Sequence, residues 1–382
     1  MVDQKIPFNR PYRTGREPSL VAEAYRNGRL AGNGPFTRGC QEWLEGRVGC
    51  RRALLTHSCT AALEMAATLC DVKPGDEVIL PSYTFVSTAN AFVSRGATPV
   101  FVDIRPDTLT LNGERVLEAM NERTKAIVPV HYAGVGCDMT AYREIARERR
   151  VLIVEDAAQA ILSERDGRPL GSVGELAALS FHETKNVSSG KGGALLVNDE
   201  RLAARAEVIW ENGTNRPEFH RGAVDRYTWV DQGSCYLPGE IMAALLSAQL
   251  DEADLITRQR RVMWDAYHDA FESLEQQGVL RRPFVPRACQ HNAHMYYLLL
   301  STAEARTEMI EFLRHKGVAA VFHYVPLHSS PAGKRYGRSI GELTVTDDIA
   351  SRIVRLPLWF GLEPELERVI LAVTDFFSSV EA

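Results

Sequence analysis

Short hydrophobic runs alternate with amphipathic stretches along the first two thirds of the chain. The runs predict buried strands near residues 54–56, 97–103, 126–130, 151–156, 177–181 and 194–197, and one more within residues 74–85. The stretches between and after them predict helices near residues 61–67, 87–95, 114–121, 139–149, 200–212 and 239–253. Strands that alternate with helices at this spacing indicate an α/β fold, with a mostly parallel sheet covered by helices on both faces.

The remaining third has a different pattern. A long amphipathic helix is expected over 258–276, and we place a domain boundary just before it. This divides the chain into a large domain, residues 1–255, and a smaller C-terminal α+β domain, residues 256–382. The smaller domain has expected strands at 296–300 and 355–359, an apolar stretch at 318–328, and helices near 303–316 and 363–378.

Two segments carry no regular pattern. Two prolines within residues 6–11 exclude a helix and indicate an extended N-terminal arm. Residues 213–238 are irregular, polar and aromatic. A long irregular stretch of this kind within a compact domain is usually a functional or interface loop.

Composition excludes several classes of protein. The 382 residues are 45% hydrophobic and 24% charged, with a net charge of −5, so nothing favours a nucleic-acid or membrane partner. The N-terminus lacks the apolar core of a signal peptide, and we expect a cytoplasmic protein. Seven cysteines without a Cys-x-x-Cys pair predict reduced thiols and no metal site.

Lys185 stands in a polar, glycine-rich turn between two apolar runs, 177–181 and 194–197. A lysine at the mouth of two buried strands loses part of its hydration, which lowers its pKa and frees the amine to attack carbonyl groups. Imine formation is the chemistry that this placement favours.

Other parts of the chain supply what an imine enzyme needs. Ser58, Cys59 and Thr60 begin an alanine-rich helix, and the first N–H groups of such a helix bind phosphate well. Phe85 offers an aromatic face, and Asp156 ends a buried strand where α/β sheets bind ligands. Pyridoxal phosphate requires a phosphate site, a flat partner for its ring, a carboxylate for its pyridine nitrogen and a lysine for its aldehyde.

Competing motifs are missing from the sequence. No Gly-x-Gly-x-x-Gly follows a strand, and Gly190-Lys191-Gly192 does not complete a P-loop. Neither His-Glu-x-x-His nor Gly-x-Ser-x-Gly occurs, which removes the zincin and α/β-hydrolase interpretations.

The chain resembles the nucleotide-sugar aminotransferases of the DegT/DnrJ/EryC1/StrS family from Ile6 to the C-terminus. Four segments carry the resemblance. The segments are Pro81-Ser-Tyr-Thr-Phe-Val-Ser-Thr-Ala-Asn90, Glu155-Asp-Ala-Ala-Gln159, Phe181-His-Glu-Thr-Lys-Asn186 and His323-Tyr-Val-Pro-Leu-His328. The resemblance is strongest to members that form dTDP-4-amino-4,6-dideoxygalactose. It implies fold type I of the pyridoxal-phosphate enzymes and a homodimer with active sites at the subunit interface.

The resemblance also implies roles for individual residues. Lys185 would bind the cofactor aldehyde and Asp156 the pyridine nitrogen, while Phe85 would stack on the ring and Gln159 would lie near its hydroxyl. Phosphate would be held by residues of the helix start and one strand end, namely Ser58, Cys59, Thr60 and Ser180. Four residues would lie near the cofactor or the sugar nucleotide: His182, His323, Tyr324 and His328.

Two positions depart from the family pattern. Many members have an asparagine that reaches the partner subunit's phosphate, where this chain has Leu237. The turn after the lysine usually carries a glutamate, where this chain has Lys191. Lys191 would be either a contact for an anionic substrate or an exposed residue.

The implied reaction moves the amino group of L-glutamate, through pyridoxamine phosphate, to C4 of a dTDP-4-keto-6-deoxyhexose such as dTDP-4-keto-6-deoxyglucose. A 3-keto nucleotide sugar is an alternative substrate. A sugar dehydratase of the same family is disfavoured because those enzymes typically have histidine in place of Lys185. A non-catalytic regulator that binds pyridoxal phosphate and a plain α/β domain with a solvated Lys185 are the remaining alternatives.

Overall fold

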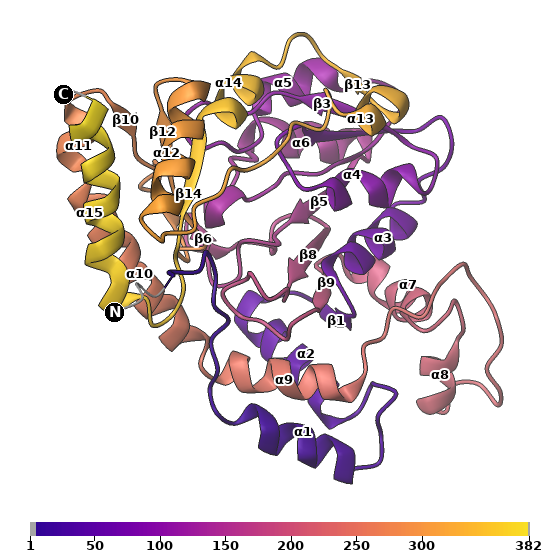
Figure 1. Cartoon of the computed structure of the whole chain (residues 1–382). Coiled ribbons are helices and arrows are strands. Elements are labelled where there is room, and N and C mark those ends of the chain that lie inside the picture. Colours follow the sequence, from indigo (N-terminus) through magenta and orange to yellow (C-terminus); the bar gives the residue numbers. More distant parts are fainter. Residues whose placement is uncertain (1–4, 381–382) are drawn as a thin grey trace.

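A mostly parallel sheet forms the centre of the molecule (Figure 1). The structure is a computed structural model that describes residues 5–380. Within that range, eight strands pair in the order β1-β9-β8-β5-β4-β2-β3-β13. They are β1 (Arg52–Thr56), β9 (Gly193–Val197), β8 (Leu176–Ser180), β5 (Leu152–Asp156), β4 (Thr124–Ile127), β2 (Glu77–Pro81), β3 (Thr98–Val102) and β13 (Arg338–Ser339). Among these described strands, only β9 runs antiparallel to the rest.

Helices cover both faces of this sheet because alternate strand residues point to opposite sides. In β1, Leu54 packs in the hydrophobic cluster of one face, whereas Ala53 and Leu55 pack in that of the other. The first face carries α3 (Cys59–Leu69), α4 (Val86–Val93) and α7 (Glu200–Trp210). The second carries α2 (Pro35–Val48) and α9 (Glu240–Asp251), with α5 (Gly113–Ala119) and α6 (Thr140–Arg149) further along the sheet.

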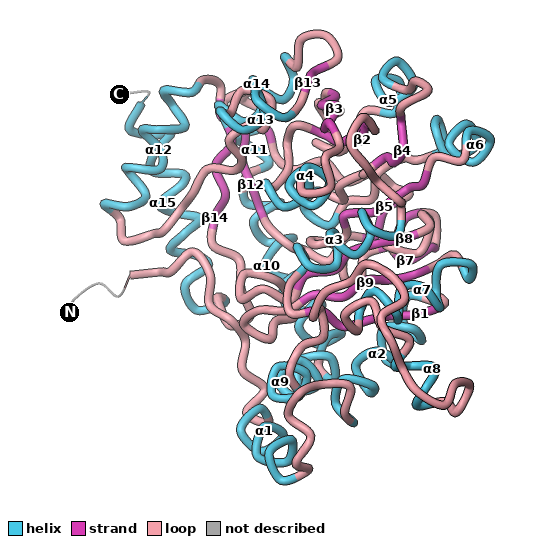
Figure 2. Tube along the Cα trace, turned by 90° about the vertical axis from the view of Figure 1, so that its right-hand side faces the viewer, coloured by secondary structure: helices cyan, strands magenta, loops and turns pink. Residues whose placement is uncertain are grey.

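The C-terminal part builds a second, antiparallel sheet in the order β10-β12-β14. Its strands are β10 (Leu280–Arg281), β12 (Tyr296–Leu300) and β14 (Ile353–Leu356). Around it lie α10 (Ala253–Ala270), α11 (Glu272–Gln276), α12 (Ala303–His315), α14 (Thr344–Arg352) and α15 (Glu363–Val380). Figure 2 shows α12 and α15 together at one end of the molecule, away from α1 (Glu17–Arg26) and α9. Residue 255, our predicted boundary, falls inside α10 and stays a prediction.

Shorter elements complete the chain. They are α8 (Arg216–His220), α13 (Pro331–Tyr336), the 3₁₀ turn Tyr132–Gly134, and a small sheet of β6 (Glu164–Arg165), β7 (Arg168–Pro169) and β11 (Cys289–Gln290). Throughout the described residues, no helix is both long enough and apolar enough to span a bilayer.

The expected α/β fold is confirmed, together with most of the expected strands and helices. Two details differ. Helix α1 was not anticipated from its weakly apolar sequence, and the long helix expected over 258–276 is broken at Phe271, between α10 and α11. The apolar stretch 318–328, for which no element was expected, makes isolated bridges from Val318 to Ile6 and from Val321 to Arg355.

The sheet direction positions the functional residues. Because β1, β2, β5 and β8 are parallel, their carboxyl ends lie at one edge. Ser58 follows β1, Phe85 follows β2, Asp156 ends β5 and Lys185 follows β8. Since β9 runs the other way, its start at Gly193 also meets this edge and brings Lys191 with it. Ligands bind at this edge in α/β sheets.

Candidate active site

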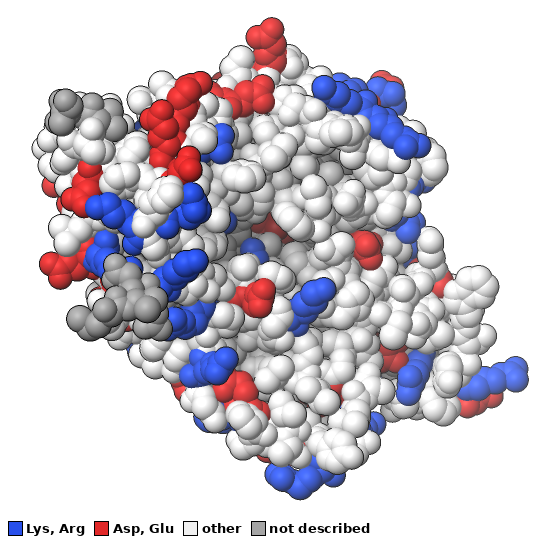
Figure 3. Space-filling model, in the orientation of Figure 1, with Lys and Arg blue, Asp and Glu red and all other residues white. Residues whose placement is uncertain are grey.

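A cavity of about 660 Å³ opens at this edge. Figure 3 shows the corresponding face, hollowed near its centre, with basic and acidic side chains in and around the hollow. Eleven of the twelve site residues expected from the sequence line the cavity: Ser58, Cys59, Thr60, Phe85, Asp156, Gln159, Ser180, His182, Lys185, His323 and Tyr324. Their assigned roles stay predictions, but the fold brings these residues together.

The twelfth, His328, does not line this cavity. Its Nδ1 lies 2.7 Å from the Ser82 hydroxyl, and its backbone N–H donates to the same oxygen at 3.0 Å. Its Nε2 lies 3.5 Å from Asp347. His328 therefore fixes the segment that follows β2 against the C-terminal part, and its substrate contact stays a prediction.

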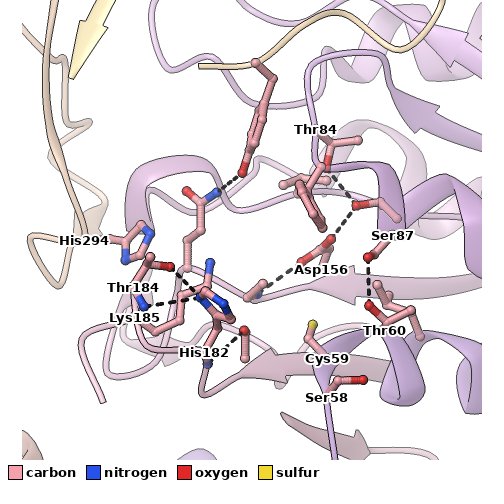
Figure 4. Close-up of a pocket in the computed structure, with 18 of the residues that line it drawn as sticks. Ser58, Cys59, Thr60, Thr84, Ser87, Asp156, His182, Thr184, Lys185 and His294 are labelled. Carbon is pink, nitrogen blue, oxygen red and sulfur yellow. Dashed lines mark hydrogen bonds between the residues drawn. The ribbon is translucent and has the colours of Figure 1, made fainter. Parts of the chain in front are cut away.

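Lys185 lies deep in the polar turn after β8, where its backbone N–H donates to the carbonyl of His182 at 2.9 Å. Figure 4 shows Lys185 close to Thr184 and His294. Burial lowers the pKa of the Lys185 amine to about 8, although the negative charge of Asp156 and the neighbouring Cys59 oppose the shift. The positive charge of Arg355 lowers this pKa further. An amine in this state is a usable nucleophile and proton acceptor near neutral pH.

Asp156 is held rigidly at the end of β5 and is only 5% exposed. Its Oδ2 accepts a hydrogen bond of 2.7 Å from Thr88, and its Oδ1 accepts one of 3.1 Å from the backbone N–H of Ala158. The Thr84 and Thr88 hydroxyls lie 2.8 Å apart, which extends the chain of hydrogen bonds (Figure 4). The carboxylate is thus fixed in orientation before a ligand arrives.

The neighbouring acid, Glu155, points to the opposite face of the sheet and has a structural role. It is fully buried, and it accepts hydrogen bonds from Gly171, Val173 and Gly174 as well as contacting His131 at 2.7 Å. Burial alone would raise the pKa of Glu155, but the hydrogen bond and charge of His131 hold it below its usual range. Of the two acids, only Asp156 belongs to the cavity.

The start of α3 forms the other end of the cavity. Ser58 caps the helix by accepting a hydrogen bond of 3.1 Å from the backbone N–H of Ala61. The first N–H groups of a helix have no partner within the helix and attract anions. The Thr60 hydroxyl lies 2.8 Å from that of Ser87, a residue of α4 (Figure 4). A Cβ at Gly193 would lie 2.5 Å from the backbone N of Cys59, so only glycine allows β9 to approach the helix start.

Gln159 and Tyr324 line the cavity together and are joined by a hydrogen bond. The side-chain oxygen of Gln159 accepts a hydrogen bond from the backbone N–H of Ala133 at 2.6 Å. The side-chain NH₂ group of Gln159 donates to the Tyr324 hydroxyl at 3.2 Å. Phe85 is 56% exposed although it lines the cavity, and its ring centroid lies 6.4 Å from that of Tyr324. A ring left this exposed beside a cavity has an apolar face available to a flat ligand.

These residues fit pyridoxal phosphate. The helix start, with Thr60 and Ser87, suits its phosphate, and the fixed carboxylate of Asp156 suits a protonated pyridine nitrogen. The exposed Phe85 ring suits its plane, and the amine of Lys185, with its lowered pKa, suits its aldehyde.

Several cavity residues were missed by sequence reasoning. Thr84, Ser87 and Thr88 lie within the 81–90 segment, and only the structure shows their hydrogen bonds. His294 and Arg355 come from the C-terminal part, and the sequence signal for Arg355 was a charge within an otherwise apolar strand. His294 Nδ1 lies 3.0 Å from the Asn186 side-chain oxygen, and burial lowers the pKa of His294 well below its usual value.

The structure places both residues that depart from the family pattern, Lys191 and Leu237. Lys191 lines the cavity and is exposed at its rim. Leu237 lies outside this cavity and lines a separate, smaller hollow beside Gly32. Neither position changes the arrangement of Lys185 and Asp156.

Comparisons with known proteins agree with this geometry. The model of the DegT/DnrJ/EryC1/StrS aminotransferase family matches residues 12–374. The spore coat polysaccharide biosynthesis protein SpsC of Bacillus subtilis is 32% identical, with 98% of each chain covered.

Solved structures of aminotransferases are also similar to this chain. The aminotransferase TlmJ from Streptoalloteichus hindustanus has a TM-score of 0.89 at 32% identity, covering 99% of this chain and 100% of TlmJ. Spr1654 from Streptococcus pneumoniae, solved in a PLP-form, has a TM-score of 0.87 at 25% identity, covering 97% of this chain and 99% of its own. The chain therefore belongs to the DegT/DnrJ/EryC1/StrS aminotransferase family and is a pyridoxal-phosphate-dependent sugar aminotransferase of fold type I.

Proposed function

We propose that the enzyme transfers the amino group of L-glutamate to C4 of a dTDP-4-keto-6-deoxyhexose, with dTDP-4-keto-6-deoxyglucose as the substrate. The observation that carries the proposal is the meeting of Lys185, Asp156 and the start of α3 in one cavity. The nucleotide, the position C4 and glutamate rest on the resemblance of residues 81–90, 155–159, 181–186 and 323–328 to family members with this activity.

Several cavity residues have definite tasks in this reaction. When bound, pyridoxal phosphate supplies an aldehyde that carries the amino group between substrates and a ring that withdraws electrons. The Lys185 amine takes the proton from the α-carbon of glutamate, because its lowered pKa leaves part of it neutral near pH 7. Asp156 holds a proton on the pyridine nitrogen. Ser58, Cys59, Thr60, Ser87 and Ser180 would hold the phosphate, and Phe85 would offer its apolar face to the ring.

Product analysis tests the proposal directly. The purified enzyme, loaded with pyridoxal phosphate, is incubated with L-glutamate and dTDP-4-keto-6-deoxyglucose, and the product is examined by NMR. We expect one amine at C4 and one 2-oxoglutarate per product. The H3–H4 and H4–H5 couplings distinguish the galacto from the gluco product. An amine at C3, or no turnover with glutamate, would contradict the proposed substrates.

The enzyme works as a homodimer whose subunits meet near the cavity. The 213–238 loop supports this, because Tyr227, Trp229 and Val230 are 52%, 78% and 52% exposed. Exposed apolar side chains gathered on one loop mark an interaction surface. Trp229→Ser should shift the protein towards monomer in sedimentation analysis, whereas Leu371→Ser, on α15, should leave it dimeric. An unchanged dimer in the Trp229 variant would place the interface elsewhere.

A further inference from the structure

Lys191 is a cation at the rim of the cavity that the reaction outlined above does not use. It stands two residues before β9, whose first residue, Gly193, pairs with Thr56 of β1 on one side and with Ser180 of β8 on the other. Helix α3 begins shortly after β1 ends. Lys191 therefore stands just beyond the part of the sheet edge from which this helix starts.

The neighbours of Lys191 indicate which way its side chain is directed. A Cβ at Gly193 would lie 2.5 Å from the backbone N of Cys59, at the start of α3. A Cβ at Gly192 would instead lie 2.9 Å from the sulfur of Met242, on α9. Side chains alternate between the two faces along a strand, and the same alternation, continued back from β9, directs Lys191 to the face of α3. In agreement with this, Lys191 lines the cavity together with the helix start.

The Lys191 amine is not engaged by the protein. Within residues 5–380 it makes no ion pair, hydrogen bond or contact with an aromatic ring. Only the backbone is fixed, because the Ser189 hydroxyl donates to the carbonyl of Lys191 at 2.9 Å. A lysine amine is a compact charge on a flexible stem of four carbons. Lys191 thus combines an anchored backbone with an amine that is free to reach a ligand in the cavity.

The phosphate end of the cavity is otherwise lined by neutral groups (Figure 4). They are Ser58, Cys59, Thr60, Ser87 and Ser180. A phosphate monoester carries close to two negative charges at pH 7. A helix start offers the equivalent of only about half a positive charge, so these groups leave most of the phosphate charge uncompensated.

Two other lysine or arginine side chains line the cavity, and neither belongs to the phosphate end. Lys185 is the amine for the cofactor aldehyde, and Arg355 comes from β14 of the small sheet. The cation that stands beside the start of α3 is Lys191.

We propose that Lys191 binds the phosphate group of pyridoxal phosphate. The inference rests on the pyridoxal-phosphate chemistry of the proposed function and adds a residue to its phosphate site. Lys191 supplies the positive charge that the hydroxyl and backbone N–H groups of this end lack. A contact between an ammonium group and a phosphate is a charge-assisted hydrogen bond, which is stronger than a neutral one.

Pyridoxal, which has the aldehyde and the ring but no phosphate, isolates this role. Pyridoxal phosphate and pyridoxal are each titrated into the cofactor-free enzyme, and the absorbance of the bound compound gives its dissociation constant. Lys191→Met should bind pyridoxal phosphate about tenfold more weakly than the wild type does, and pyridoxal equally well. Lys191→Arg should stay within about threefold of the wild type for both compounds, because it keeps the charge. Lys191→Glu should weaken pyridoxal phosphate on the order of a hundredfold, because it repels the phosphate.

Lys73→Met is the matched control. Lys73 is an exposed lysine near the other end of α3, and it does not line the cavity. Its removal changes the net charge by the same amount but should alter neither titration. Salt gives a second check on the phosphate contact. The difference between the wild type and Lys191→Met should shrink when KCl is raised from about 0.05 M to about 0.5 M, because salt screens an exposed charge.

Three outcomes would overturn the inference. One is an equal weakening of both compounds in Lys191→Met, since Lys191 would then act on the aldehyde or on the fold. Another is unchanged binding of pyridoxal phosphate. The third is unchanged cofactor binding together with a higher half-saturating concentration of dTDP-4-keto-6-deoxyglucose, which would assign Lys191 to the diphosphate of the sugar nucleotide. The titrations contain neither glutamate nor keto-sugar. A wrong assignment of those substrates would leave the titrations unchanged, so the failure of the inference and that of the proposed function are distinguishable.

Discussion

At the Asp156 end of the cavity the carboxylate and the threonine hydroxyls have hydrogen-bond partners, whereas at the Arg355 end a buried guanidinium nitrogen has no hydrogen-bond partner among the described residues. Asp156 is held by Thr88 and Ala158, and Thr60 by Ser87. Arg355 has a buried Nε without a partner, and its charge acts on Lys185. The satisfied end suits a cofactor that stays bound through both half-reactions. The unsatisfied end suits substrates that enter and leave, since their binding supplies the missing partner.

Replacing Lys185 should impair the function of both ends of the cavity. Lys185→Ala should lower turnover on the order of 10⁴-fold, because it removes the nucleophile and the base together. Borohydride should no longer attach the cofactor to the protein, which mass spectrometry would show. Lys191→Ala should keep the borohydride-trapped product. Trapping that persists in Lys185→Ala and disappears in Lys191→Ala would assign the chemistry to Lys191 instead.

Asp156→Asn should affect only the end of the cavity that holds the cofactor. The neutral amide cannot stabilise a proton on the pyridine nitrogen, and losing one member of a buried charged pair costs about 3–5 kcal/mol. We therefore expect turnover to fall on the order of a hundredfold or more, with glutamate still binding. The same loss of activity combined with loss of 2-oxoglutarate binding would show that Asp156 supports the substrate end as well.

Thr88→Val tests the orientation of Asp156. The variant removes the 2.7 Å hydrogen bond and leaves the carboxylate with the 3.1 Å bond from Ala158. A hydrogen bond to a charged group contributes about 1.5–3 kcal/mol, so turnover should fall about tenfold or somewhat more. The reduction should be equal in both half-reactions. A change confined to the glutamate half-reaction would contradict this assignment.

The smallest effect links the two ends through Lys185. Its amine attacks only when neutral, so cofactor capture by the cofactor-free protein should speed up with pH and level off above about 8. Arg355→Met should move this inflection upward, because the positive charge of Arg355 lowers the Lys185 pKa. Arg306→Met, which removes an arginine that does not line the cavity, should not move it. Absorbance of the captured cofactor between pH 6 and 11 gives the curve, and an inflection near 10.5, the ordinary lysine value, would refute the lowered pKa.

Local patterns determined much of the sheet and the cofactor end of the site. Apolar runs such as 177–181 and 194–197 have one stable environment, a buried strand, and the polar residues just after such strands must lie at its edge. For that reason Lys185 and Asp156, together with the helix start at Ser58, could be assigned from the order of elements. The same reasoning gave Phe85, and the resemblance added Gln159 and Ser180 to this edge.

The partners of those residues were decided by the tertiary structure. Thr88 contacts Asp156 across 68 residues of sequence, and His294 contacts Asn186 across 108. Phe8 stacks on Arg355 from the opposite end of the chain. His328, predicted at the substrate, is held by Ser82 outside the cavity. A sequence pattern reports which face of its own element a residue occupies, whereas these contacts depend on how separate elements pack. That packing places Arg355 and Lys185, which are far apart in the sequence, in one cavity.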